Sequence, residues 1–290
     1  KGGWEGFLNS GEINMNSLAD TQPIQSQAIR PVIWFSKQRA VSYGLSAVSI
    51  ILSIVLWQLA SHYHVNLGFI NFANVPSPID VIHSFVAFVE LDTALAHVKA
   101  SIVRVLIGFF LAGLVGVILG LLIGYSKAVA AIFMPPLEIL RPIPAVAWIP
   151  LAILMFPSSE ASMIFITFLG ALFLILLNTI HGVEAVDRRL LASAQSLGAG
   201  QFAILREVII PGSLPSITTG LAIGMGTCWF CLVTAEMISG QLGIGYFTWE
   251  SFTLQNYADI IVGMLLIGAL GMLSSALLRF LGKNSPLGIS

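Results

Sequence analysis

Charged side chains are scarce in this chain of 290 residues. Lys, Arg, Asp and Glu make up 9 % of it, whereas a soluble protein carries about 25 %. A soluble chain so poor in charge could not cover its surface, and 57 % of the residues are hydrophobic. The net charge of −1 leaves no basic tract for nucleic acid, and two cysteines exclude a disulfide scaffold. We therefore predict a polytopic protein that spans a lipid bilayer.

The runs without charge reach the length of about 20 residues that a membrane-crossing helix needs. Because these runs are continuous rather than alternating, they favour helices over a barrel. The predicted fold class is an all-α membrane protein with six transmembrane helices. The predicted spans are residues 41–60, 105–125, 142–159, 161–182, 208–235 and 260–278. In the second span Gly116, Gly120 and Gly124 form a small-xxx-small ladder, which is a packing signal.

Basic residues indicate the orientation of these spans. With the N-terminus in the cytoplasm, ten of the 13 Lys and Arg residues fall on the cytoplasmic side, and only Lys99 lies clearly outside. Such an excess of basic residues is typical of cytoplasmic loops. We expect a multi-pass protein of the plasma (inner) membrane with both termini in the cytoplasm. In the external loop, residues 76–78 (PSP) and the apolar residues after them predict a turn and a short helix.

The loop between the fourth and fifth spans carries the most informative pattern. Its apolar residues repeat at helical spacing, pause at residues 198–200 (GAG) and resume until Pro211. They are Leu190, Leu191, Ala194, Leu197, Phe202, Leu205, Val208 and Ile209. The pattern predicts a helix, a glycine turn and a second helix on the cytoplasmic side. Such a pair either lies on the bilayer or on the protein's own spans, or enters a groove on a cytosolic partner.

This loop resembles the signature loop of ABC importer permeases. The resemblance rests on residues 193–199 (SAQSLGA) and on the Ile-Pro pair that ends at Pro211. Ala192 stands where the family has Glu, and Ser193 stands where it has the first Ala. Gly198 and Pro211 hold their places in the family pattern.

Two further stretches resemble one branch of that family. Residues 141–151 (RPIPAVAWIPL) and 235–245 (AEMISGQLGIG) look like the branch that moves nitrate, bicarbonate, taurine and alkanesulfonates. Within it the chain is most similar to cyanobacterial nitrate and bicarbonate permeases, and the resemblance extends over residues 75–283.

The resemblance implies a type I ABC importer permease fold that functions as a homodimer. It also implies two cytosolic ATPase subunits docked on the signature loops and a separate external substrate-binding protein. In the nitrate and bicarbonate systems the two ATPases differ, and one carries a fused binding-protein-like domain. ATP and Mg are bound by those partner subunits, and the chain itself needs no cofactor or metal. It has no G-x-x-x-x-G-K-[ST] loop and is therefore not an enzyme by itself.

The resemblance also divides the chain and places the ATPase contacts. Residues 1–40 form a polar N-terminal cytoplasmic segment, which we expect to be poorly ordered until roughly Pro31. Residues 41–98 hold the first span and the external loop, residues 99–283 the core permease domain, and residues 284–290 a C-terminal tail. The cytoplasmic coupling loop lies at 187–211. The residues expected to couple to the ATPase are Ala192, Ser193, Ala194, Leu197, Gly198, Ala199, Phe202, Arg206 and Pro211.

Arg141 is one of two charges that stand inside the membrane segments. An ionisable group at the bilayer centre costs about 2.5–3.5 kcal/mol on insertion scales. Arg141 follows an apolar half-span and precedes Pro142 and Pro144, so the third span is expected to be interrupted or kinked. Arg141 then faces the pathway and attracts an anion. Alternatively it pairs with Glu138 or stabilises the C-terminal end of a helix.

Glu236 is the second such charge, at the far end of the fifth span. An unpaired carboxylate would repel anionic cargo, so the favoured interpretation is structural pairing with Arg104. The alternative is an outer gate whose contacts change during transport. The residues predicted to line the translocation pathway are Arg141, Pro144, Trp148, Thr227 and Glu236.

The remaining polar residues of the spans have simpler interpretations. Thr218, Thr219, Thr227 and Thr234 either face a polar pathway or bond back to their own helix. Cys228 and Cys231 lie three residues apart and are expected to pack. The sequence from Gly243 to Gly245 is predicted to be a turn.

Together these features predict the transmembrane subunit of an ATP-driven importer. Its cargo is a small inorganic oxyanion, with nitrate or nitrite as the first choice, and it works by alternating access. Within the family the alternatives are bicarbonate and then taurine or alkanesulfonates. An alternative of a different class is a secondary anion transporter or channel, which would work without a cytosolic ATPase. A membrane enzyme would need clustered His, Asp or Glu at one depth, and the sequence offers no such cluster.

Overall fold

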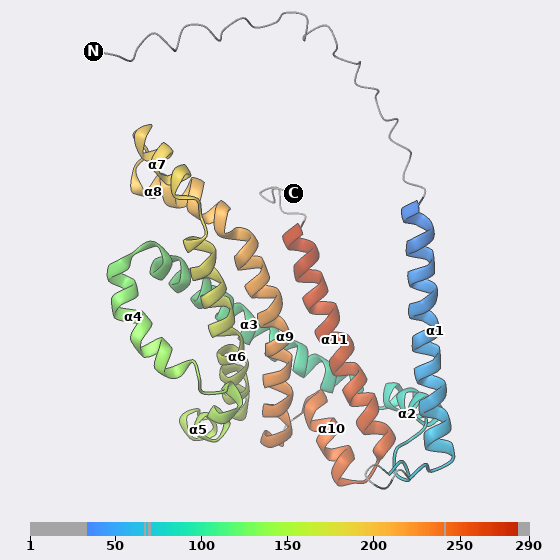
Figure 1. The fold of residues 1–290 in the computed structure, drawn as a ribbon. Coiled ribbons are helices and arrows are strands. Elements are labelled where there is room, and N and C mark those ends of the chain that lie inside the picture. The colour runs from blue at the N-terminus through green and yellow to red at the C-terminus, as the bar shows by residue number, and fades with distance from the viewer. Residues whose placement is uncertain (1–33, 67, 69–70, 241, 284–290) are drawn as a thin grey trace, which may run out of the picture. The chain divides into compact units, whose positions relative to one another are not determined.

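The computed structural model describes residues 34–66, 68, 71–240 and 242–283, and every regular element among them is helical (Figure 1). The expectations for residues 1–33 and for the tail at 284–290 lie outside this described part. The elements are α1 (Trp34–His62), α2 (Pro78–Glu90), α3 (Ala94–Tyr125), α4 (Lys127–Leu140), η2 (Ala145–Trp148), α5 (Ile149–Met155), α6 (Ser159–Glu184), α7 (Arg188–Ser196), α8 (Gln201–Ile204), η3 (Leu205–Ile209), α9 (Ile210–Ser239), α10 (Ile244–Thr253) and α11 (Tyr257–Lys283).

The chain divides within α1 into two units, one ending at Ser53 and one beginning at Ile54. The described part of the first unit is helical from Trp34 onward. The second unit contains all the other elements. Within it, α7 and α8 lie at one end, and α5 and α10 lie at the other (Figure 1). We call these the α7–α8 end and the α10 end.

Five described helices are long and apolar enough to cross a membrane, and a sixth span exists if one bent pair is counted together. The five correspond to the predicted first, second, fourth, fifth and sixth spans, with longer ends. The bent pair is α4 and the segment Ala145–Met155, which meet at 83°. The predicted interruption is therefore confirmed. The predicted bounds of the third span, 142–159, are wrong, because Pro142 and Pro144 fall in the break and the longer helix α4 comes before it.

Helix α6 packs against α3 on one side and α9 on the other. On α3, Gly116, Gly120 and Gly124 face the side chains of Ile175, Thr179 and Val183 of α6, so the predicted packing role of this ladder is confirmed. Gly108 of α3 makes the same close approach to Thr167. Lipid tails are as apolar as the side chains, so the hydrophobic effect does not drive helices together in a membrane. Close packing of helix backbones therefore contributes much of the association.

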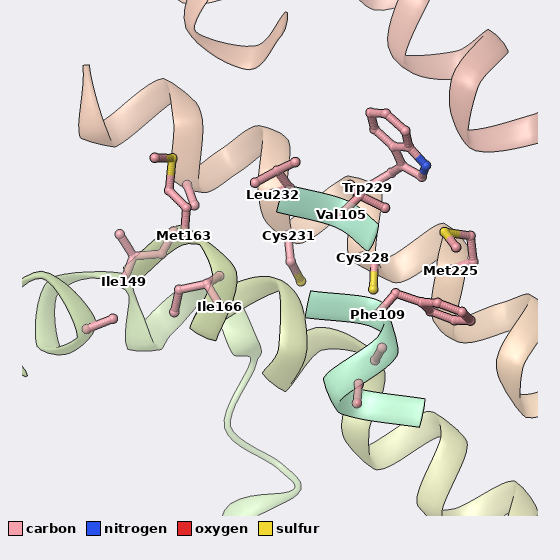
Figure 2. Close-up of a cluster of buried hydrophobic side chains, with 14 of the residues drawn as sticks. Val105, Phe109, Ile149, Met163, Ile166, Met225, Cys228, Trp229, Cys231 and Leu232 are labelled. Atoms are coloured by element: carbon pink, nitrogen blue, oxygen red, sulfur yellow. The ribbon is translucent and has the colours of Figure 1, made fainter. Parts of the chain in front are cut away.

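The core lies where α3, α5, α6 and α9 meet (Figure 2). Side chains of the four helices converge there and exclude solvent. They include Val105, Phe109, Ile149, Met163, Ile166, Met225, Cys228, Trp229, Cys231 and Leu232. The expectation that both cysteines pack is thereby confirmed. Helix α5 is short, but Ile149 and Ala152 are buried in this core, and Ser162 Oγ donates a 3.0 Å hydrogen bond to the Ala152 carbonyl. The second half of the broken span is therefore fixed to α6.

Helix α2 is the short helix predicted after residues 76–78. Ser77 caps its start: Ser77 Oγ accepts from Asp80 N at 3.3 Å, and Asp80 Oδ2 accepts from Ser77 N at 2.9 Å. Hydrogen bonds from the Ser77 hydroxyl and N–H hold the pKa of the Asp80 carboxyl below its usual value. This reciprocal capping begins α2 at a defined residue.

Helix α10 was not predicted. Gly243 has a φ of +152° and lies in the turn before the helix, as the sequence indicated. Gly245, however, already belongs to α10. The turn at Gly243–Gly245 is therefore shorter than predicted, and it leads directly into ten helical residues.

Gly120→Ala should lower the free energy of unfolding by about 1–3 kcal/mol, the usual cost of overpacking. The new Cβ would lie 2.6 Å from Thr179 Cβ and 2.9 Å from the Leu176 carbonyl oxygen. Gly113→Ala is the matched control on the same helix, because its nearest neighbour is Leu221 Cδ2 at 3.5 Å. The measurement is the Tm of the solubilised protein. Equal Tm values for the two variants would contradict the role of the ladder.

Candidate functional site

The coupling loop folds as the predicted helix, glycine turn and helix. Asp187 caps α7 through its side chain, which accepts from Arg189 N at 2.8 Å. The turn follows at Leu197, and Gly198 adopts a φ of +80°, a left-handed conformation that glycine tolerates and other residues avoid. Helix α8 then continues through the π-helical segment η3 into α9. A displacement of α8 is therefore transmitted directly to a membrane span.

The coupling loop has one packed side and one exposed side. Ile204 and Ile209 are buried against Val183 of α6, with Ala194 and Ala199 partly buried beside them. By contrast, Leu197 is 88 % exposed and Phe202 is 75 % exposed. The other predicted coupling residues divide in the same way. Ala192, Ser193, Gly198 and Arg206 are exposed, and Pro211 is half-buried.

The break in the third span places Arg141 at the end of α4. Its N–H donates to the Leu137 carbonyl at 2.9 Å, and the chain then turns through Pro142–Pro144. Arg141 and Pro144 are exposed, and Trp148 is half-buried against the core. Among the described residues no ion pair joins Arg141 to Glu138, and both side chains are exposed. The pairing alternative is therefore wrong, and the position at a helix C-terminus is confirmed.

The threonines of α9 bond back to their own helix. Thr227 Oγ1 donates to the Ile223 carbonyl at 3.3 Å, and Thr218, Thr219 and Thr234 make equivalent bonds. Thr227 is half-buried. The sequence left open whether these hydroxyls face a polar pathway or bond back to their own helix. The structure shows that they bond back to their own helix.

Glu236 is fully buried, and it is paired as the sequence favoured. Its Oε1 accepts from Arg104 Nη1 at 2.8 Å and from Ser101 Oγ at 2.8 Å, and its Oε2 accepts from Gly245 N at 2.9 Å. The side chain is 0 % exposed. In this conformation the carboxylate is enclosed by its own subunit, so Glu236 does not line an open pathway.

Arg104 also binds a second carboxylate, that of Glu160. Arg104 Nε donates to Glu160 Oε2 at 2.8 Å, and Arg104 Nη2 donates to Glu160 Oε1. Arg104 Nη1 further donates to the Leu242 carbonyl. The Arg104 side chain is 4 % exposed and that of Glu160 is 53 % exposed. We call Ser101, Arg104, Glu160 and Glu236 the polar cluster.

The polar cluster and the turn after α9 are held by one face of α3. His97, Ser101 and Arg104 follow one another at i, i+4 and i+7, the spacing of one helix face. Ser101 Oγ accepts from Ile244 N at 2.9 Å, and His97 Nδ1 lies 3.2 Å from Gly243 N. Sequence reasoning missed His97, Ser101 and Glu160. The helical spacing of polar residues in an otherwise apolar span was the available signal for the first two.

Residues 112–285 match the protein family described as "Binding-protein-dependent transport system inner membrane component". The chain belongs to this family. It is an ABC importer permease, a multi-pass inner-membrane subunit that carries no ATPase site, because ATP is hydrolysed by partner subunits. The family match includes the coupling loop, both halves of the broken span and Glu236.

Three relatives come from the branch that the sequence indicated. The nitrate import permease of Synechocystis is 33 % identical over 246 residues, which cover 81 % of this chain and 86 % of the relative. The bicarbonate transport permease of Synechococcus elongatus is 34 % identical, with 63 % and 66 % covered. A Bacillus subtilis permease, provisionally named for aliphatic sulfonates, is 30 % identical, with 80 % and 82 % covered.

The fold also matches a solved structure. A crystal structure of an amino acid ABC transporter aligns with a TM-score of 0.52 and 17 % identity, covering 71 % of this chain and 95 % of that chain. This likeness supports the type I importer permease fold.

Glu236→Ala should lower the Tm of the permease and the amount of assembled protein. The change removes the acceptor of Ser101 Oγ and Gly245 N, and an unsatisfied buried group costs about 1–3 kcal/mol. Glu250→Ala is the control, because Glu250 is exposed and accepts only from Tyr246 Oη among the described bonds. Its effect should stay within about 0.5 kcal/mol. If both variants behave alike, Glu236 has no structural role.

Proposed function

We propose that this permease imports a small oxyanion, with nitrate as the first choice. The names of the three relatives differ in cargo, but nitrate, bicarbonate and sulfonates all present oxygen atoms that share a negative charge. The alignment to the nitrate permease is the longest of the three, at 246 residues. Bicarbonate is the second candidate, and taurine or alkanesulfonates are the third.

The observation that carries the ATP-driven mechanism is the exposed side of the coupling loop. Leu197 and Phe202 are exposed on the coupling loop, which also carries the exposed Arg188, Arg189 and Arg206. The basic residues favour a cytoplasmic place for this loop. Of the alternatives for its exposed apolar side, we choose a protein partner over the bilayer surface. A groove on a cytosolic ATPase subunit would cover Leu197 and Phe202, in the manner of helix-in-groove recognition.

The proposed assembly is a homodimer with two cytosolic ATPase subunits and an external binding protein. The two ATPases differ, and one carries a fused binding-protein-like domain, as in the nitrate and bicarbonate systems that the sequence resembles. Both termini lie in the cytoplasm. ATP and Mg are held by the ATPases.

Transport then proceeds by alternating access. Closure of the ATPase dimer draws the two coupling loops together, and each loop moves its own α9 because α8, η3 and α9 are continuous. Arg141, exposed at the break between α4 and α5, attracts the anion into the pathway between the two copies. Pro144 lies in that break and Trp148 in η2, and both line the pathway. Thr227 lies on α9, and its hydroxyl is bonded to the Ile223 carbonyl, so it offers the anion no free donor.

Gly198→Val tests the coupling role. A β-branched residue at a φ of +80° is strained by about 1–2 kcal/mol, so the turn should rearrange and uptake per ATP hydrolysed should fall about tenfold. Gly200→Val is the matched control, because Gly200 has a φ of −71° and no neighbouring atom within 4 Å of an added Cβ. Unchanged uptake in Gly198→Val would remove the basis for ATPase docking on this turn.

Arg141→Ala tests the pathway role. Loss of about 1 kcal/mol of attraction should reduce anion flux per assembled complex about fivefold, and Arg141→Lys should restore most of it. Assembly should be normal in both variants, because the Arg141 side chain is exposed. Poor assembly combined with normal flux per complex would show that Arg141 serves the fold instead.

A further inference from the structure

The two edges of the Arg104 guanidinium have different surroundings. The Nη1 atom points to the buried Glu236 and to the Leu242 carbonyl. The Nε–Nη2 edge, which carries two parallel donors, is occupied by the two carboxylate oxygens of Glu160. Glu160 is half exposed on the subunit, whereas Arg104 is nearly enclosed. The Nε–Nη2 edge therefore lies one carboxylate away from the surface of the subunit.

The two carboxylates are held to different extents. Glu236 accepts from Arg104 and Ser101 of α3 and from Gly245 of α10, so three donors on two helices fix its position. The described hydrogen bonds of Glu160 all come from Arg104. Glu236 alone neutralises the guanidinium, so the polar cluster has a net charge of −1 with both carboxylates ionised. Departure of Glu160 into water leaves a neutral buried pair, which avoids the cost of an unpaired buried charge.

A guanidinium edge with two parallel donors recognises planar oxyanions in a bidentate manner. The Glu160 carboxylate shows this mode directly, since it presents two coplanar oxygens as nitrate and bicarbonate do. Exchange of the Glu160 carboxylate for another monovalent anion leaves the net charge of the cluster at −1. We propose that the Nε–Nη2 edge of Arg104 is a binding site for a small monovalent oxyanion, and that Glu160 occupies it in this structure and yields it to the anion.

Glu160 follows the broken span, which the proposed function places along the pathway. Glu160 lies in the first turn of α6, directly after α5, the second half of the broken span. The tethered carboxylate competes with free anion at an effective concentration of about millimolar or more. The site therefore binds the anion weakly. Weak binding suits a transport site, because the cargo must also be released from it. That the bound anion is also the transported anion rests on the proposed function.

Glu160→Ala tests the site in the assembled permease–ATPase complex without nucleotide. The Tm is measured in nitrate, bicarbonate and chloride at matched ionic strength. In Glu160→Ala, nitrate or bicarbonate should raise the Tm saturably, by about 2–4 °C at tenfold excess over Kd, whereas chloride offers no coplanar oxygens and should not. Glu250→Ala, which removes an exposed carboxylate of α10, should respond like the unmodified protein.

Two results would overturn the proposal. One is an equal Tm response to chloride and to nitrate in Glu160→Ala, which would reduce the effect to ionic screening. The other is a response no larger than that of Glu250→Ala. As a further check, Arg104→Lys in the Glu160→Ala background keeps the charge beside Glu236 but removes the two-donor edge, so the preference for oxyanions should disappear.

This experiment measures anion binding without ATP. A negative result can therefore be told apart from a failure of ATP-driven uptake. Uptake without binding at Arg104 would contradict only the site. Binding without uptake would contradict only the transport function.

Discussion

The arrangement of the α10 end depends on one buried cation. Arg104 joins α3 to the first turn of α6, to the end of α9 and to the turn before α10. These partners are separated from it by 56, 132 and 138 positions in the sequence. A buried guanidinium requires this degree of pairing, because an unpaired charge in a low-dielectric interior is strongly destabilising. Glu236 is a structural residue because it supplies one of the negative charges that the buried Arg104 needs.

The glycine contacts of α6 extend this rigidity along the membrane spans. Gly108, Gly116, Gly120 and Gly124 bring α3 against α6, and Gly220 and Gly224 bring α9 against α6 at Ile175, Asn178 and Ala171. Closely packed helices change their arrangement as blocks rather than by continuous deformation. Two segments are less constrained, namely the coupling loop with its exposed Leu197 and the break that exposes Arg141. Movement driven from the cytoplasm would therefore enter through the coupling loop and reach the pathway through α9.

The sequence predicted those features that are encoded locally. Continuous apolar runs located the spans, Pro142 and Pro144 indicated the break, and Gly198 located the turn of the coupling loop. The start of the broken span was missed, because α4 contains Pro135 and Pro136 and still forms a helix. Helix α10 was missed because its ten residues are too short to be recognised as a span.

The composition of the polar cluster was predicted only in part. Arg104 and Glu236 were paired because both charges stood out in apolar segments and needed partners. Glu160 was not, because it lies at the end of a span where a charge needs no explanation. Its contact with Arg104 follows from the packing of α3 against α6, which no local periodicity describes.

The most direct test of the account is uptake of labelled nitrate by proteoliposomes that contain the permease, its ATPases and its own binding protein. With ATP supplied on the ATPase side, nitrate should accumulate against its gradient, with labelled bicarbonate measured in parallel. Removal of ATP or of the binding protein should abolish the uptake. Accumulation that persists without ATP or without the ATPase subunits would contradict an ATP-driven importer and would indicate a secondary transporter or a channel.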